Sequence, residues 1–380
     1  MIHRKLQAVV ENKLFRGKAI ILTGARQVGK STLCKEIVNR FAGQSLTLDC
    51  DEPEVKELLT DINSARLKML VGKSRIVFID EAQRVPEIGM TLKRFTDNFP
   101  EVQLLVSGSS SFELQNRLNE PLTGRKYEYR LYPISTTEII DTNGMLHACQ
   151  MLEFRLVYGS YPDIVSRMGE AKELLMNLSG SYLYKDVLSS GAVRRPALLE
   201  KLLVALALQV GSEVSYNELA QTVGTDNKTV EKYVDLLEKC YIVFRLNAFS
   251  RNLRSELKKS KKIYFYDNGI RNAVIQNFAP LSLRADVGAL WENFVVAERI
   301  KENHYAGRYV KSYFWRTAAQ QEIDYVEEAD GRFSLFEMKW NSKKSKSSFP
   351  KVFLENYSIK ETAIVTPDNY MEWLLGIDTL

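Results

Sequence analysis

Residues 24–31 read GARQVGKS and are preceded by the apolar run KAIILT at 18–23. A short apolar run rich in β-branched residues is typical of a buried parallel strand. The residues that follow the loop, 33–40, favour a helix. Strand, glycine-rich loop and helix in this order predict a phosphate-binding loop. We therefore expect an α/β domain that binds a nucleoside triphosphate.

This loop contains the residue types that phosphate binding requires. Glycines at 24 and 29 let the backbone approach phosphate oxygens, and the N–H groups at the start of the helix face the anion. Lys30 supplies a positive charge toward the β and γ phosphates, and Ser31 supplies a hydroxyl for Mg²⁺. The predicted nucleotide-binding residues are Gly24, Ala25, Arg26, Gln27, Val28, Gly29, Lys30, Ser31 and Thr32.

A second apolar run, 76–79, ends in Asp80 and Glu81. At the tip of a strand, Asp80 is placed to hold Mg²⁺ through water or through Ser31. Glu81 is suited to orient and polarise the attacking water. The acidic pair therefore predicts that the nucleotide is hydrolysed and that Glu81 is a catalytic residue.

Three further residues are candidates for a role in hydrolysis. The run 102–106 predicts a strand, and the polar stretch after it offers Ser107 and Ser109 as sensors of the γ-phosphate, without a choice between them. Arg125 follows a glycine and precedes the strand-like run 127–132. We expect either an ordinary surface arginine or one that neutralises transition-state charge, in its own subunit or in a neighbour's.

The first third of the chain alternates between strand and helix patterns. The expected strands are 18–23, 45–49, 75–80 and 102–107, and the expected helical stretches are 30–41, 54–71 and 86–98. This alternation predicts a parallel sheet covered on both faces. Ligands bind at the carboxyl ends of such strands, where Thr23, Asp80 and Ser107 are expected.

The composition of the 380 residues is that of an ordinary globular protein with a net charge of +5. No apolar run approaches the roughly 18 residues that cross a bilayer, and residues 1–5 lack a secretory signal pattern. The four cysteines have no paired spacing, and three histidines make a His-rich metal site unexpected. We therefore expect a reducing compartment, the cytoplasm, and no membrane partner.

The middle of the chain predicts a helical stretch at 136–196 and a winged helix-turn-helix at 197–270, with three helices before two strands. Ser215 and Glu218 are expected to form a capping box on the second helix. A basic run falls where a wing would be and contains Arg251, Arg254, Lys258, Lys259, Lys261 and Lys262. Such a fold either contacts nucleic acid, here DNA, or serves domain packing and self-association, and both alternatives stay open.

A second group of charged residues lies near the C-terminus. The helical stretch 288–301 carries Glu292, and two strand-like runs carry Asp324, Glu337 and Lys339. In a strand, Glu337 and Lys339 face the same side. Carboxylates beside a lysine can hold a second divalent metal, Mg²⁺ or Mn²⁺, and place a water against phosphate. The alternative is a set of surface charges on a structural domain.

The chain resembles prokaryotic ATPases that join an N-terminal AAA+-like domain to a C-terminal domain of unknown function. The N-terminal resemblance rests on GARQVGKST, IDEAQ, SGSSS and LTGRKYEYRLYPIS, and the C-terminal one on YGSYP, LYKDV, YFYDNGIRNAV, LWENFVVAE and QEIDYV…FEMKW. It covers nearly the whole chain and implies ATP as the nucleotide, with Lys30, Ser31, Asp80 and Glu81 in their usual roles. It also implies a winged helix followed by a restriction-endonuclease-like fold, in which the acidic residues are Glu292, Asp324 and Glu337 and the lysine is Lys339.

The expected organisation is an AAA+-like P-loop domain at 1–135, a helical connector at 136–196, a winged helix-turn-helix at 197–270 and an α/β endonuclease-like domain at 271–380. The first functional hypothesis is an Mg²⁺-dependent ATPase that acts as a switch or motor on nucleic acid, with a homo-oligomer as one form of assembly. One alternative is a signalling or scaffold ATPase whose C-terminal half binds a protein. Another is a metal-dependent nuclease gated by ATP.

Overall fold

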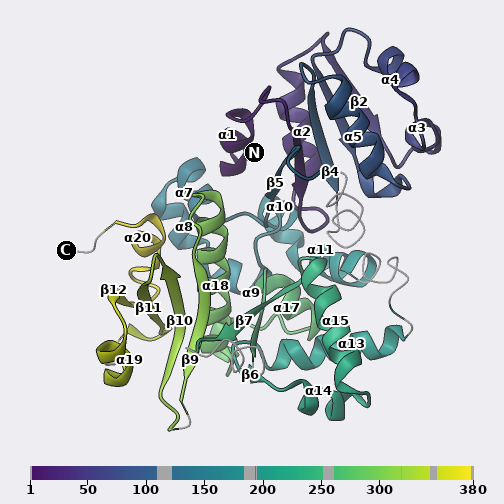
Figure 1. Cartoon of the computed structure of the whole chain (residues 1–380). Helices are drawn as coiled ribbons and strands as arrows, with labels where there is room; N and C mark the ends of the chain where they lie inside the picture. Colours follow the sequence, from purple (N-terminus) through teal and green to yellow (C-terminus); the bar gives the residue numbers. More distant parts are fainter. Residues whose placement is uncertain are drawn as a thin grey trace. The chain divides into compact units, whose positions relative to one another are not determined.

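The computed structural model describes residues 2–108, 122–183, 193, 195–250, 261–317, 319–342 and 349–377, with only the backbone at 181–183. The described chain forms two compact units. Unit 1 consists mainly of residues up to Pro133, and unit 2 consists mainly of residues from Ile134 onward. Figure 1 shows both units and labels most of their helices and strands.

Unit 1 is built on a five-stranded sheet in the order β2-β3-β4-β1-β5, and every neighbouring pair is parallel. Its strands are β1 (Ala19–Thr23), β2 (Ser45–Asp49), β3 (Ile76–Asp80), β4 (Gln103–Gly108) and β5 (Lys126–Arg130). Its helices are α1 (Lys5–Glu11), α2 (Lys30–Asn39), α3 (Pro53–Leu59), α4 (Ser64–Val71) and α5 (Ile88–Asn98), with the short turn η1 (Ala82–Arg84) after β3. The structure confirms the predicted parallel sheet.

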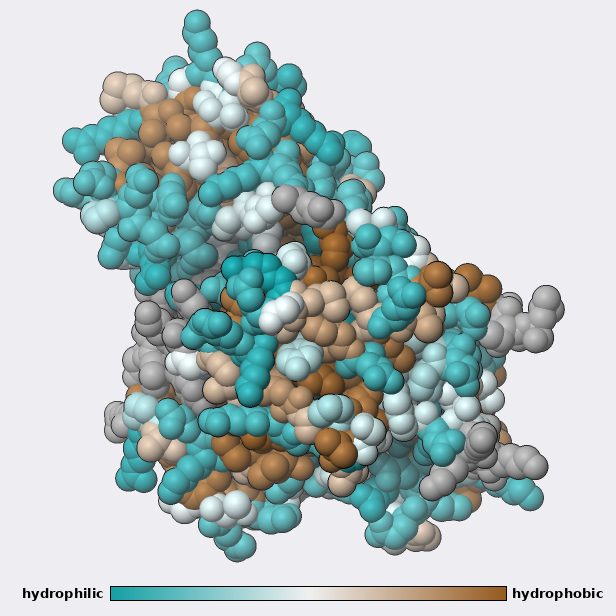
Figure 2. All heavy atoms as spheres, turned by 180° about the vertical axis from the view of Figure 1, so that it is seen from behind, coloured by the Kyte–Doolittle hydropathy of each residue, from teal (hydrophilic) through white to brown (hydrophobic). Residues whose placement is uncertain are grey.

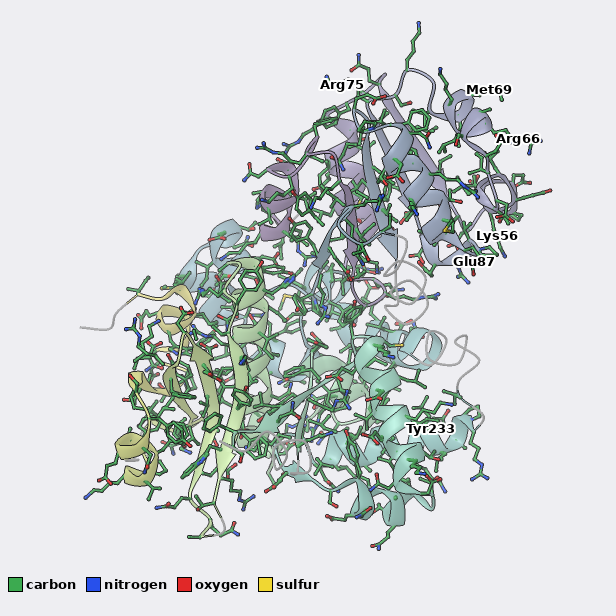
Figure 3. All side chains as sticks on the ribbon, in the orientation of Figure 1. Lys56, Arg66, Met69, Arg75, Glu87 and Tyr233 are labelled. Atoms are coloured by element: carbon green, nitrogen blue, oxygen red, sulfur yellow. The ribbon has the colours of Figure 1, made fainter. Side chains whose placement is uncertain are left out.

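The helical stretch expected at 54–71 is two helices, because the backbone leaves the helical conformation at Thr60. Asn63 then begins α4 by accepting a hydrogen bond of 2.9 Å from the backbone N–H of Arg66. Arg66 and Met69 point away from the sheet, and Leu67 on the opposite side of α4 is fully buried (Figure 3). The amphipathic pattern of α4 therefore fixes its packing face although the long helix is interrupted.

Unit 2 begins with helices and continues as a mixed α/β body. The helical elements are α7 (Thr136–Asn143), α8 (Met145–Gln150), α9 (Leu152–Tyr158), α10 (Pro162–Ser166), η2 (Met168–Glu170), α11 (Ala171–Asn177), η3 (Leu178–Leu183), α13 (Pro196–Leu208), α14 (Tyr216–Val223), α15 (Asn227–Lys239), α17 (Asn268–Val274), η4 (Leu281–Leu283), α18 (Val287–Tyr305), α19 (Lys351–Asn356) and α20 (Tyr370–Leu375). The capping box expected at Ser215 does not form, since that side chain makes no capping hydrogen bond. A capping box is present at Ser135 and Glu138, at the start of α7.

The strands of unit 2 form one seven-stranded sheet in the order β12-β11-β10-β9-β7-β8-β6. They are β6 (Glu213–Val214), β7 (Val243–Ala248), β8 (Lys261–Phe265), β9 (Lys311–Arg316), β10 (Glu322–Ala329), β11 (Arg332–Met338) and β12 (Ile359–Val365). The parallel pairing of β7 with β9, with Asn247 opposite Tyr313, joins the two halves of this sheet. The strands expected in a wing and those expected in a C-terminal domain therefore share one hydrogen-bonded sheet.

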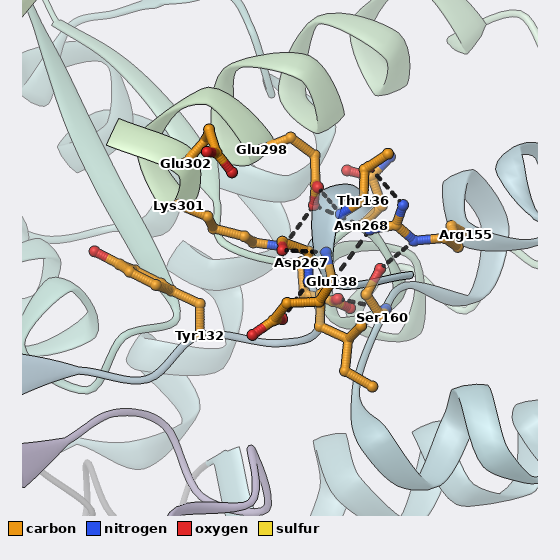
Figure 4. A network of polar contacts seen from close by, with 12 residues as sticks. Tyr132, Thr136, Glu138, Arg155, Ser160, Asp267, Asn268, Glu298, Lys301 and Glu302 are labelled. Carbon is orange, nitrogen blue, oxygen red and sulfur yellow. Dashed lines mark hydrogen bonds and ion pairs between the residues drawn. The ribbon is translucent and has the colours of Figure 1, made fainter. Parts of the chain in front are cut away.

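A buried polar network ties the first helices of unit 2 to α17 and α18 (Figure 4). Arg155 on α9 donates to Glu298 on α18 at 3.1 Å and to Ser160 at 2.8 Å. Lys301 pairs with Glu298 at 2.7 Å, and Asp267 accepts from the backbone N–H of Ser160 at 2.7 Å. These five residues come from the YGSYP, DNG and VVAE stretches of the sequence or lie beside them. Three of the stretches on which the C-terminal resemblance rests are therefore held together by buried polar and charged groups.

The surface carries both hydrophilic and hydrophobic side chains, and apolar ones gather in several places on the face seen in Figure 2. Met69, Leu146 and Leu283 are more than 70% exposed. Across the described ranges, every helix is too short or too polar to cross a membrane.

Candidate functional site

The phosphate-binding loop joins β1 to α2. Gly29 precedes α2 with a φ of 94°, and Gly24 has a φ of 150°. A Cβ at Gly24 would lie 2.2 Å from the carbonyl oxygen of Leu131, so a side chain cannot be accommodated there. Lys30 is 4% exposed, and its ammonium donates to the carbonyls of Gly24 and Ala25 at 3.0 and 2.8 Å. A buried lysine is thus held at the loop by neutral carbonyls that phosphate oxygens can replace.

Three polar side chains meet beside the loop, at the ends of β3 and β4. Ser31 donates to Oδ1 of Asp80 at 2.8 Å, and Ser107 donates to the same oxygen. A hydroxyl and a carboxylate in contact are a suitable pair of hard oxygen ligands for Mg²⁺. Asp80 is 4% exposed, so a cation between these groups would be sheltered on the protein side.

Acidic groups dominate the electrostatics of this edge of the sheet. Burial, and after it the charges of Asp49 and Asp80, raise the pKa of Cys50 to about 12. Burial raises the pKa of Cys34 as well, and Asp80 adds to the increase while Lys30 opposes it. The negative field that these thiols experience favours a divalent cation at the same place.

Glu81 follows Asp80 with a left-handed backbone, φ 51°, which is uncommon for a residue other than glycine. Its N–H faces Oδ1 of Asp80 at 3.2 Å and the Ser107 hydroxyl at 3.3 Å. Oε2 of Glu81 accepts a hydrogen bond from the side-chain amide of Gln83. The backbone and the carboxylate of Glu81 are therefore both fixed by neighbours.

A second charged cluster lies in the sheet of unit 2. Lys339 pairs with Glu337 at 2.7 Å and lies 3.7 Å from Asp324. Asp324 also accepts from the backbone N–H of Met338 at 2.9 Å. Glu292 on α18 accepts from Lys262 at 3.0 Å and from the Tyr264 hydroxyl at 2.7 Å. The sequence-predicted carboxylates thus lie in one region, and Lys262 is an additional member.

The pKa values in this cluster show how the charges are balanced. Burial, and after it the charge of Asp324, raise the pKa of Glu337 to about 7 although Lys339 opposes the increase. Burial also raises the pKa of Glu292, while Lys262 opposes it. For Lys262, burial alone would lower the pKa, but the charges of Glu292 and Asp324 raise it above its usual range. The carboxylates are therefore compensated by lysine ammonium groups.

The predicted second metal site has no support in this arrangement. In the part of the chain that the structure describes, no three His, Cys, Asp or Glu side chains are placed to share a metal ion. Lys262 pairs with both Glu292 and Glu322, the latter at 2.7 Å, and so provides the positive charge that a cation would bring.

Comparison with known protein families matches residues 16–140 to the AAA domain family. The N-terminal part of the chain is an AAA domain. Two further families, both described as domains of unknown function, match residues 149–281 (DUF8612) and residues 287–374 (DUF4143). The chain therefore joins an AAA domain to two such domains, where the sequence resemblance implies an AAA+-like domain and one C-terminal domain of unknown function.

Proteins similar to this chain occur in bacteria and archaea. An uncharacterized protein of Mycobacterium tuberculosis is 28% identical over 97% of this chain and 80% of its own length. An uncharacterized protein of Methanocaldococcus jannaschii is 24% identical over 78% of this chain and 70% of its own length. Among solved structures, the RuvB Holliday junction branch migration motor of Thermotoga maritima has 16% identity and a TM-score of 0.34, covering 67% of this chain and 93% of its own. A superposition with that score carries no weight for function.

Within the AAA domain, Arg125 does not lie near the phosphate-binding loop. It precedes β5, whose first residue, Lys126, is paired with Ala19 at the amino end of β1. The loop follows the opposite end of β1, about 13 Å further along the strand. Arg125 pairs there with Asp97 at 2.6 Å. The structure therefore does not bring Arg125 to the loop of its own subunit, and its role in hydrolysis stays a prediction.

The two predicted sensor residues have different outcomes. Ser107 is fully buried and contacts Asp80 and the backbone of Glu81, as given above. Ser109 lies outside the described residues.

Sequence reasoning misplaced Lys262 and missed Gln83 and Arg4. Lys262, expected on a DNA-binding wing, is 2% exposed and faces carboxylates inside unit 2. Arg4 donates to the carbonyl of Val28 in the phosphate-binding loop at 2.7 Å and to that of Tyr132 at 2.6 Å. In a strand over 261–265, Lys262 lies on the same face as Tyr264, and this spacing was the available signal. No sequence signal identifies Arg4, since its partners are backbone atoms far along the chain.

Proposed function

We propose that the AAA domain binds ATP with Mg²⁺ and hydrolyses it, and that the cycle switches the state of the C-terminal half. The observation that carries this proposal is the convergence of Ser31, Asp80 and Ser107 beside the loop that holds Lys30. These are the residue types that phosphoryl transfer uses, at the edge of a parallel sheet where ligands bind.

Each residue has a distinct task in this proposal. Lys30 exchanges its two carbonyl partners for oxygens of the β and γ phosphates. Ser31 and Asp80 would hold the Mg²⁺ ion, which neutralises charge on the phosphates. Glu81 orients the attacking water and accepts its proton. Ser107, in contact with Asp80 and the backbone of Glu81, is placed to couple metal binding to the position of the base.

The experiment that tests this proposal compares two variants with the parent protein. Glu81→Gln should bind ATP with unchanged affinity but hydrolyse it about 10²- to 10³-fold more slowly, a loss of roughly 2–4 kcal/mol of transition-state stabilisation. Lys30→Ala should lose ATP binding in calorimetry. A parent protein that neither binds nor hydrolyses Mg-ATP would overturn the proposal.

The first proposal for the partner of the C-terminal half is nucleic acid. Its support is the element order of unit 2, in which α13, α14 and α15 precede the paired strands β7 and β8, as expected of a winged helix-turn-helix. ATPase rates with and without double- and single-stranded DNA, at two salt concentrations, test this partner. Stimulation that falls with salt supports it, and a rate indifferent to every nucleic acid contradicts it.

A protein partner is the second candidate, and the charge of α15 favours it. This helix, which would enter the DNA groove, carries three lysines and three carboxylates and is therefore neutral. Lys262 is paired inside unit 2 and cannot neutralise a phosphate of DNA. An ATP-dependent complex with one protein, together with indifference to DNA, would establish a scaffold ATPase.

Two finer proposals concern assembly and cleavage. Arg125 would act on the nucleotide of a neighbouring copy, so the specific ATPase rate should rise with protein concentration and Arg125→Ala should abolish the rise.

Phosphodiester cleavage by the unit 2 cluster would require that the parent protein cleaves DNA in the presence of Mn²⁺ and that Asp324→Ala does not. An inert parent protein in that assay removes the nuclease alternative.

A further inference from the structure

The carboxylate of Glu81 contacts Gln83, a residue that has no role in the proposed function described above. The side-chain amide of Gln83 donates to Oε2 of Glu81. Gln83 is 6% exposed, whereas Glu81 is half-buried. The donor of this hydrogen bond therefore belongs to the packed interior, and the acceptor is the group that must meet the reacting water.

The backbone that carries Gln83 is held on both sides. Within η1, the N–H of Arg84 donates to the carbonyl of Glu81 at 2.9 Å, and that of Val85 donates to the carbonyl of Ala82 at 3.1 Å. Ala82 and Val85 are fully buried in the core of unit 1. Gln83 thus projects from an anchored turn, so its amide is a fixed donor for the carboxylate of Glu81.

An amide is the suitable chemical group for this contact. A lysine or arginine in the same place would pair with Glu81 and reduce its capacity to accept a proton. An amide N–H orients one carboxylate oxygen without adding positive charge, and leaves the carboxylate its negative charge. The left-handed backbone of Glu81, φ 51°, points to the same conclusion, because such a conformation persists where the surroundings hold a functional residue in place.

We propose that Gln83 is a positioning residue for Glu81, whose carboxylate it holds in the orientation that activates the attacking water. The inference rests on the proposed ATPase function and adds a residue to it. Misplacement of a catalytic group by about 1 Å costs roughly a hundredfold in rate, so loss of this donor should act on the chemical step and leave ATP binding unchanged.

The test replaces Gln83 by Met, which keeps the length of the side chain and removes the donor. We expect kcat for ATP hydrolysis to fall roughly tenfold to a hundredfold, with KM, the ATP dissociation constant and the melting temperature unchanged. The matched control is Gln7→Met, because Gln7 is also 6% exposed and donates to a glutamate, Glu11, at 2.9 Å. This control should hydrolyse ATP at the parent rate.

A double variant separates positioning from a general structural role. If Gln83 acts only through Glu81, then Glu81→Gln with Gln83→Met should be as slow as Glu81→Gln alone. The inference would be overturned if the double variant lost kcat by the product of the two single losses. It would also be overturned if Gln83→Met bound ATP more weakly, or if its kcat were unchanged or increased. If Gln83→Met does not fold, Gln83→Ala is measured in its place by the same criteria. If these outcomes occur although Glu81→Gln is slow, only the role of Gln83 is refuted and the proposed ATPase function stands. A parent protein without ATPase activity refutes the proposed function itself.

Discussion

At the scale of single residues, the nucleotide site depends on contacts from outside its own motifs. Arg4 is 8% exposed, and its guanidinium bonds to the carbonyls of Val28 and Tyr132. Hydrogen bonds from a charged donor are worth more than neutral ones, and removal of the donor leaves a buried carbonyl unsatisfied. Arg4 therefore stabilises the conformation in which the loop backbone receives phosphate.

We expect Arg4→Met to weaken Mg-ATP binding roughly tenfold, since about 1.4 kcal/mol of loop stabilisation would be lost. Isothermal titration of the Glu81→Gln background measures this without turnover. Arg40→Met is the matched control, because Arg40 forms an exposed ion pair with Glu11 and such pairs contribute little. Equal affinities in the two variants would show that the loop does not need Arg4.

The sequence predicts the residues of this site that lie together in short motifs. Lys30, Ser31, Asp80 and Glu81 fall in two short motifs whose residue types alone indicate phosphate and metal chemistry. The contacts of Arg4 and Gln83 depend on side-chain direction and on partners that the sheet brings close, and no local pattern contains that information. The position of Arg125 was missed for a related reason, since only the register of β5 on β1 shows which end of the sheet it occupies.

At the scale of elements, unit 2 is held together by close backbone approach as well as by charge. A Cβ at Gly159 would lie 1.9 Å from Oδ1 of Asp267, and one at Gly269 would lie 2.1 Å from the carbonyl of Tyr158. The end of α9 and the start of α17 therefore touch through two glycines. Helix and strand spans follow from periodicity, but this contact and the β7–β9 pairing are long-range and could not be predicted from the sequence.

Gly159→Ala should lower the free energy of unfolding far more than Gly144→Ala. Both glycines have a positive φ, 76° and 87°, but a Cβ at Gly144 meets nothing within 4 Å. The conformational cost is about 1–3 kcal/mol in each, and Gly159→Ala adds the clash with Asp267. Urea denaturation followed by circular dichroism gives both values. A difference below about 1 kcal/mol would mean that the α9–α17 contact adjusts freely.

The charge network on α18 predicts a specific acid sensitivity. Burial alone would raise the pKa of Glu298, but Lys301, Arg155 and a bond from the Thr136 N–H lower it to about 2. Because this pKa is depressed in the folded state, Glu298 contributes stability above its usual pKa and loses it as the pH falls from about 5 to about 2. The contribution is on the order of 3 kcal/mol.

Glu298→Gln should therefore be less stable than the parent protein at pH 7 and should lose less further stability on acidification. Asp267 acts in the opposite direction, since burial raises its pKa although Lys301 opposes this. Asp267 is present in both proteins, so the difference between the pH profiles of the parent and of Glu298→Gln isolates Glu298. Denaturant titrations at intervals between pH 7 and pH 3 provide the profiles. Parallel profiles would assign the acid sensitivity to other groups.

At the scale of the whole molecule, the division into two units predicts how ATP affects stability. All proposed ATP ligands belong to unit 1, whereas the Arg155–Glu298 network belongs to unit 2. A ligand that binds only the folded state stabilises it by about 2.7 kcal/mol at a hundred times its dissociation constant. Calorimetry of Glu81→Gln should accordingly show two unfolding transitions, and Mg-ATP should raise mainly the transition temperature of unit 1.

Any rise in the transition temperature of unit 2 measures the coupling free energy that a switch requires, of order 1–3 kcal/mol, and Lys30→Ala should remove both shifts. If the unit 2 transition does not move at all with saturating Mg-ATP, nucleotide binding is not communicated to unit 2 and the switch proposal is wrong, even if the AAA domain hydrolyses ATP.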